Sequence, residues 1–158
     1  MTDYAWLQQD IAKETAEAFS IATSKEDEDD IFAELNQLRP WANKLLENFC
    51  QKAGIGLRQL SRRDALLLAT AAVFESVIAS DEWPLKFVVD ELIGGGDDYQ
   101  IEIVTSIHVL HMLETNGHIS SDERRSTVRS WLLWDEKLPR GWRDTYLELF
   151  KEQAPRLQ

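Results

Sequence analysis

The chain has 158 residues, 44% of them hydrophobic, which is enough for one domain with its own core. It has a single cysteine, Cys50, which excludes an internal disulfide. It shows neither a signal peptide nor an apolar run near the roughly 20 residues of a membrane span. We therefore expect a cytoplasmic protein with no membrane segment. The net charge of −11 disfavours a broad nucleic-acid-binding surface and favours basic partners or cations.

The first 53 residues are expected to form helices. Residues Tyr4 to Phe19 carry apolar side chains at helical spacing. The acidic run Glu26–Asp30 is interpreted as a solvated loop or as the first turn of a helix, where acids suit the positive helix N-terminus. A long amphipathic segment, Ile31–Phe49, follows, and we expect Pro40 to kink or split it.

The remaining residues, 54–158, alternate short apolar runs with helical patterns. Three strands are expected, at Ile55–Leu60, Val77–Ala79 and Ile101–Val104. Helices are expected between these strands, and three more after the last. This order predicts one helix-rich α/β domain with a small parallel sheet of three or four strands flanked by helices. An all-α bundle is the alternative if the short strands do not form.

Two carboxylates follow the first two expected strands. Asp64 comes shortly after Ile55–Leu60, and Asp81 comes just after Val77–Ala79, with Ser80 between. Ligands of open parallel sheets bind beyond the carboxyl ends of the strands, and paired carboxylates there suit Mg²⁺ or Mn²⁺. Both residues also fit a structural role, because Ser61 and Asp64 have capping-box spacing and Ser80 or Asp81 suits the N-cap of the next helix.

The stretch "LSRRDALLLATAAVFESVIASDEWPLKFVVDEL" resembles the second half of a PIN domain, the fold of VapC-type toxin ribonucleases. Asp64 matches the Asp-Ala acid that opens a buried helix in that family, and Asp81 matches the acid that closes the next strand. The family's early helical acid matches Asp10 or, with less suitable spacing, Glu34. Ala79 replaces the Thr or Ser often found before the later acid, and the family's first strand with its metal-binding Asp has no counterpart before Tyr4.

The resemblance implies a PIN-like protein of a toxin–antitoxin or defence type. If active, it would be a Mg²⁺- or Mn²⁺-dependent endoribonuclease acting on RNA, with Asp64 and Asp81 as catalytic residues and Asp10, Asp64 and Asp81 as metal ligands. The competing hypothesis is a non-catalytic acidic interaction protein, such as an antitoxin or immunity protein that covers a basic partner. The missing first strand favours this competitor, whereas the placement of the two acids favours the enzyme.

A sequence without the family's first strand leaves a sheet edge exposed, and a homodimer, a protein partner or the N-terminal helices would cover this edge.

Several other side chains have simpler interpretations. His108 and His111 are expected in packing or surface roles rather than at zinc, and Cys50 is expected to be buried. The basic pairs suit RNA contacts or solvated helix ends equally well; these pairs are Arg62–Arg63 and Arg124–Arg125.

Overall fold

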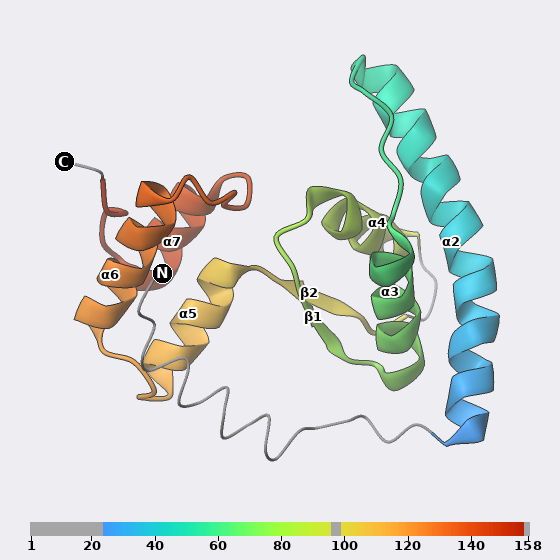
Figure 1. Ribbon diagram of the computed structural model, residues 1–158, viewed down its shortest axis with the longest axis horizontal. Coiled ribbons are helices and arrows are strands. Elements are labelled where there is room, and N and C mark those ends of the chain that lie inside the picture. The colour runs from blue at the N-terminus through green and yellow to red at the C-terminus, as the bar shows by residue number, and fades with distance from the viewer. Residues whose placement is uncertain (1–23, 96–98, 157–158) are drawn as a thin grey trace.

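The computed structural model describes residues 24–95 and 99–156, and it shows helices around two short strands (Figure 1). In chain order the elements are α2 (Lys25–Ala53), α3 (Arg62–Phe74), β1 (Val77–Ala79), α4 (Trp83–Gly94), β2 (Glu102–Val104), α5 (Ser106–Thr115), α6 (Ser121–Leu133) and α7 (Trp142–Phe150). The helix predicted at Tyr4 to Phe19, and Asp10 within it, lie outside the described residues.

The two strands form a parallel pair. Val77 pairs with Glu102, Ile78 with Ile103, and so on along the strands. The prediction of Val77–Ala79 is confirmed, and the strand predicted from Ile101 begins one residue later. The described residues therefore have a helix-rich α/β fold, and not the all-helical alternative.

The strand predicted at Ile55–Leu60 is wrong. The described residues contain two paired strands, and Ile55–Leu60 pairs with neither of them. The Leu60 N–H donates instead to the Asn43 side-chain oxygen of α2, 2.9 Å away. Leu60 is buried, but Ile55 and Leu57 are 42% and 60% exposed. The alternating pattern therefore lacks what a sheet strand needs, a neighbouring strand and a buried face.

Helix α2 runs without interruption along one side of the molecule and includes Pro40 (Figure 1). It begins with a capping box, in which Ser24 and Asp27 satisfy each other's backbone N–H groups, and it ends at Gly54 in a left-handed conformation. Its buried face extends to Cys50, which is 1% exposed, as predicted. Among the helices of residues 24–95 and 99–156, none combines the length and apolar character needed to cross a membrane.

The first core lies where α2, α3 and α4 pack together with the sheet. Leu46, Leu68 and Leu85 are fully buried in it, and Ile78 brings the core-facing side of β1 into the same cluster. Its buried members are all aliphatic, and α2 packs more extensively against α3 than any other two elements do.

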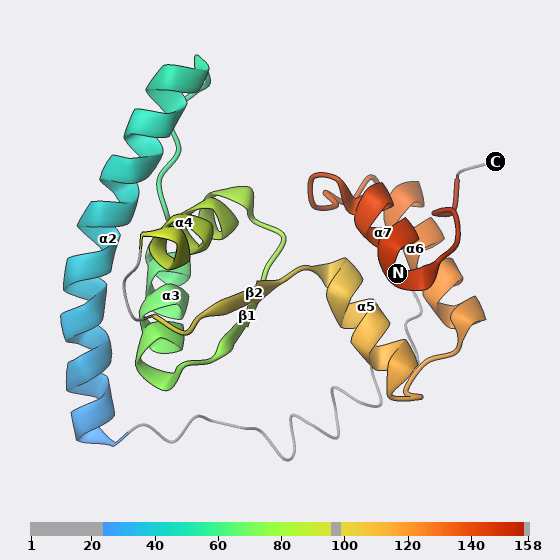
Figure 2. The ribbon, with the colours of Figure 1, turned by 180° about the vertical axis from the view of Figure 1, so that it is seen from behind.

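A second core is formed by α5, α6 and α7. Buried Ile107, Val128 and Tyr146 bring the three helices together. The predicted capping box of Ser120 and Glu123 begins α6. Figure 2 shows, from behind, that these helices lie at the opposite end of the molecule from α2, with the sheet, α3 and α4 between.

Candidate functional site

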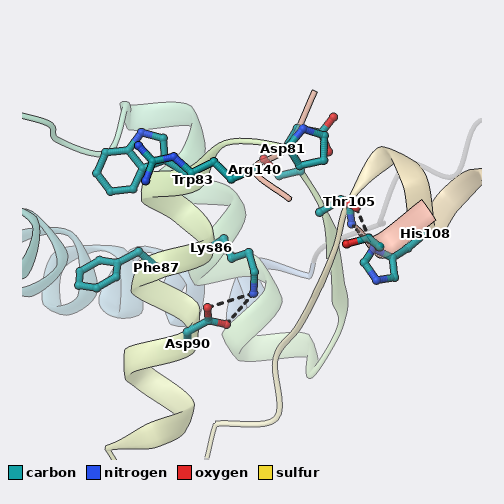
Figure 3. A pocket seen from close by; sticks show the side chains of 11 residues that line it. Asp81, Trp83, Lys86, Phe87, Asp90, Thr105, His108 and Arg140 are labelled. Carbon is teal, nitrogen blue, oxygen red and sulfur yellow. Dashed lines mark hydrogen bonds and ion pairs between the residues drawn. The ribbon is translucent and has the colours of Figure 1, made fainter. Parts of the chain in front are cut away.

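A hollow of about 280 Å³ opens at the carboxyl ends of β1 and β2, where the two cores meet. This is where open parallel sheets place their ligands. The close-up in Figure 3 shows side chains from the loop after β1, from α4, from the start of α5 and from the turn before α7. The lining residues are Ser80, Asp81, Trp83, Lys86, Phe87, Asp90, Thr105, His108, Pro139, Arg140 and Thr145.

Asp81 lies on the rim of this hollow, as its place after β1 predicts. One carboxylate oxygen, Oδ1, accepts a hydrogen bond of 2.8 Å from the backbone N–H of Ser106 in the first turn of α5. The predicted N-cap role on the next helix is therefore wrong, because Glu82 occupies the N-cap of α4 and Asp81 caps α5 across the strand pair. Asp81 thus connects the first core to the start of the second.

Thr105 and His108 form another part of the wall. The Thr105 N–H points to His108 Nδ1 at 3.3 Å, and the Thr105 hydroxyl lies 2.8 Å from the same nitrogen. Because a backbone N–H can only donate, Nδ1 is the acceptor and the neutral ring carries its proton on Nε2. His108 therefore offers a hydrogen-bond donor from a ring whose orientation is fixed at its other nitrogen.

Two cations also line the hollow. Lys86 Nζ forms an exposed ion pair with Asp90, 3.0 Å away. The guanidinium of Arg140 lies 5.6 Å from the centre of the Trp83 ring, a cation–π distance. In Figure 3 this stack lies on one side of the Lys86–Asp90 pair, and His108 lies on the other. Arg140 forms no ion pair within the described part of the chain.

Asp64, the other predicted catalytic acid, is not among the residues that line this hollow. Its backbone N–H donates to the Ser61 hydroxyl at 3.1 Å, and its carboxylate accepts from that hydroxyl at 2.7 Å. Ser61 is therefore the N-cap of α3, but the predicted capping box is incomplete, because the Asp64 carboxylate bonds to the Ser61 hydroxyl and not to the Ser61 backbone N–H. Across residues 24–95 and 99–156, no three His, Cys, Asp or Glu side chains are grouped so as to hold a metal ion. The described residues alone do not provide the predicted Mg²⁺ or Mn²⁺ site, and Asp10 is outside them.

The acidic run Glu26–Asp30 forms the first turns of α2, one of its two predicted forms. Asp27 is used in the capping box, and hydrogen bonds from the Ser24 side chain, then from its backbone, lower the pKa of that carboxyl. Glu26, Asp29 and Asp30 are exposed beyond this cap. Phe32, 51% exposed, follows them on the same helix.

Arg124 and Arg125 both pair with Glu152. Arg124 is buried, so both predicted roles, an RNA contact and a solvated helix end, are wrong for it, whereas Arg125 is 35% exposed. Arg124 is 3% exposed, and its nitrogens lie 2.6 Å from Glu152 and 2.6 Å from Glu114. The contact with Glu114 is an ion pair without the alignment of a hydrogen bond. Arg124 also donates to the Tyr146 hydroxyl. Arg62 and Arg63, by contrast, are exposed at the start of α3.

Glu152 is the centre of this network. Arg125 donates to both of its oxygens, at 3.0 and 2.7 Å, and Tyr146 donates to Oε1 at 3.0 Å. The hydrogen bond from Arg125 is the largest cause that holds the pKa of Glu152 at about 2. Burial is the largest cause that raises the pKa of Tyr146 to about 12. The carboxylate and the phenol therefore keep a fixed protonation state near neutral pH.

Several lining residues were not foreseen as part of a site. Thr105 is the first residue after β2 and Asp81 the second after β1, so the rule that identified Asp81 applies to Thr105 as well. Arg140 comes from the turn between α6 and α7, and no sequence pattern indicates that it reaches Trp83. Comparison of the chain with protein-family profiles, with curated proteins and with solved structures found no match in any of the three.

Proposed function

We propose that this chain is a non-catalytic acidic interaction protein, which uses the N-terminal half of α2 to cover a basic surface of a protein partner in the manner of an antitoxin or immunity protein. The observation that supports this most is the exposed acidic run on α2. Helix capping uses only Asp27, which leaves Glu26, Asp29 and Asp30 exposed.

The neighbouring surface supports the same function. Phe32 is 51% exposed on α2, two residues after Asp30. An aromatic anchor beside charges is typical of interface hot spots. A net charge of −11 speeds association with basic partners. The two predicted catalytic acids support helix starts, which also agrees with a non-catalytic protein.

A charge-matched pair of variants tests this function. One variant carries Glu26→Gln, Asp29→Asn and Asp30→Asn on α2. The control carries Glu91→Gln, Glu102→Gln and Glu148→Gln, three exposed acids elsewhere. Each variant removes three negative charges, so any difference in peptide binding between them reflects where the removed charges lie and not the net charge.

The probe is a fluorescein-labelled basic amphipathic helical peptide, and binding is measured by anisotropy at two salt concentrations. Because exposed charge pairs contribute about 0.2–1 kcal/mol each, we expect the α2 variant to bind roughly tenfold more weakly. The control should change about twofold or less. Equal losses in both variants would show that the peptide senses only net charge, and the assignment to α2 would then be wrong.

A second candidate is the PIN-like, Mg²⁺- or Mn²⁺-dependent ribonuclease, catalytically competent or degenerate. The position of Asp81 at the carboxyl end of β1 favours it, because the resemblance places a family acid there. Isothermal titration of the full chain with Mn²⁺, with Asp81→Asn as the comparison, is the direct test. A saturable heat that Asp81→Asn abolishes, together with Mg²⁺-dependent cleavage of RNA, would favour the enzyme over the interaction protein.

A homodimer is a further form that the interaction function can take. Light scattering over a dilution series distinguishes self-association from binding to a foreign partner. A mass of 18.2 kDa at every concentration would leave only the foreign partner.

A further inference from the structure

We infer that the hollow at the carboxyl ends of β1 and β2 binds a small phosphate ester that also carries hydroxyl groups, such as a phosphorylated sugar. This ligand site is independent of the acidic surface on α2. Some hydrogen-bonding groups of the hollow already have partners in the protein, whereas others are available to a ligand.

The carboxylates of the hollow are largely engaged. Asp90 is paired with Lys86, and Asp81 Oδ1 accepts from Ser106. The two acids therefore oppose an incoming anion less than two unpaired acids would.

The guanidinium of Arg140, in contrast, is available. Arg140 has no ion pair within residues 24–95 and 99–156, and its guanidinium is held over the Trp83 ring. A guanidinium placed in this way presents a planar fork of donors that matches two oxygens of a phosphate group. Lys86 keeps its exposed ion pair with Asp90, so its charge offsets that carboxylate and is not counted as a free cation.

His108 adds a directed neutral donor. Its Nδ1 is occupied by Thr105, so the Nε2–H is the group left for a ligand. Figure 3 shows His108 and Arg140 on opposite sides of Lys86, which distributes the donors along the wall. Donors on both sides of the hollow suit a ligand rich in acceptor oxygens.

The second carboxylate oxygen of Asp81 is the reason why we expect the ligand to carry hydroxyl groups. Only Oδ1 of this carboxylate is bonded to Ser106, and Oδ2 is left to accept from a ligand hydroxyl. A volume of about 280 Å³ is near the lower limit of roughly 300 Å³ for small-molecule pockets, which suits a single phosphorylated sugar. A site with donors for a phosphate and an acceptor for a hydroxyl should prefer the ester to either part alone.

Titration calorimetry of the full chain at low ionic strength tests this inference with three probes: ribose 5-phosphate, inorganic phosphate and ribose. We expect saturable binding of ribose 5-phosphate and binding at least tenfold weaker for the other two. No saturable heat with ribose 5-phosphate would overturn the inference. Equal affinity for inorganic phosphate would also overturn it, because the hydroxyl contact with Asp81 would then contribute nothing.

Two matched arginine variants locate the site. Arg140→Gln should weaken binding roughly 10- to 100-fold, the loss expected for one hydrogen bond to a charged group. Arg143→Gln is the control, because Arg143 also stacks on a tryptophan, Trp142, but does not line the hollow. Equal effects of the two substitutions would show that the anion binds by general attraction.

Asp81→Asn keeps an acceptor for Ser106 and should reduce the preference for the ester. An unchanged preference would contradict the role of Asp81.

Discussion

The two cores of this molecule are held together by different forces. The core around α2, α3 and α4 consists of aliphatic side chains, and its buried members include no charged group. The core of α5, α6 and α7 is packed beside a buried arginine, Arg124, which contacts two carboxylates and lies 4.0 Å from the centre of the Phe150 ring. The first core depends on volume and shape, whereas the second depends also on charge.

This difference has consequences for stability. Burial of apolar surface does not change with protonation, so the aliphatic packing of the first core should not itself depend on pH. A buried arginine is stable only while its carboxylate partners stay ionised. Glu152 supplies one of these from the segment beyond α7, where the chain turns at Lys151 in a left-handed conformation. The second core is therefore coupled both to pH and to the last described residues.

The largest effect is expected from a cavity in the first core. Leu68→Ala should lower the free energy of unfolding by about 2–5 kcal/mol, because Leu68 is fully buried. Urea denaturation at pH 7 and pH 4 measures it, and the loss should be equal at both. The control is Leu67→Ala on the same helix, 41% exposed, which should cost about 1 kcal/mol or less. Similar costs for the two substitutions would contradict the assigned packing of α3.

Removing the charge from Glu152 should be the next largest effect. Glu152→Gln leaves Arg124 buried with one remaining carboxylate, Glu114. We expect a loss of about 2 kcal/mol at pH 7, below the roughly 3–5 kcal/mol of a fully buried pair because Glu152 is 30% exposed. Hydrogen exchange should show the loss in α5–α7. A loss spread evenly over α2 and α3 would mean that the two cores do not differ in the way described.

The same carboxylate predicts how stability depends on pH. Its pKa is about 2 in the folded protein against an ordinary value of 4.5, so its stabilising contribution is complete above pH 4.5. That contribution is lost progressively as the pH falls from 4.5 towards 2. Thermal melts over this range should show a steeper decline for the wild type than for Glu152→Gln. Parallel curves would show that Glu152 does not carry the acid sensitivity.

Local patterns in the sequence predict parts of both cores. Local patterns identified the strand at Val77–Ala79, the buried face of α2 and the capping box that begins α6. The error at Ile55–Leu60 arose because alternation alone does not show whether a neighbouring strand exists. A side-chain amide from α2, 17 residues away in sequence, binds that segment instead.

The candidate site was predicted only in part, for a similar reason. A position after a strand is a local feature, so Asp81 could be placed on the rim from the sequence. The partner of Asp81 could not, because Ser106 is 25 residues away and is brought close by the parallel pairing of β1 and β2. Glu152 was missed because its partners depend on how α6 and α7 pack, which no spacing in the chain reveals.

The smallest effects concern the two acids, Asp64 in the first turn of α3 and Asp81 at the junction between the two cores. Asp64→Asn keeps an acceptor for Ser61 within α3 and should cost less than about 0.5 kcal/mol. Asp81→Asn weakens the bond to Ser106 from a charge-assisted one to a neutral one, so about 0.5–1 kcal/mol is expected, with faster hydrogen exchange at Ser106. Melting curves with and without Mg²⁺ measure both effects.

If either acid is a metal ligand, its loss should instead stabilise the metal-free protein, because clustered carboxylates repel each other. The same substitution should also abolish stabilisation by Mg²⁺. That result would replace the capping roles of these acids with the metal site of the second candidate function.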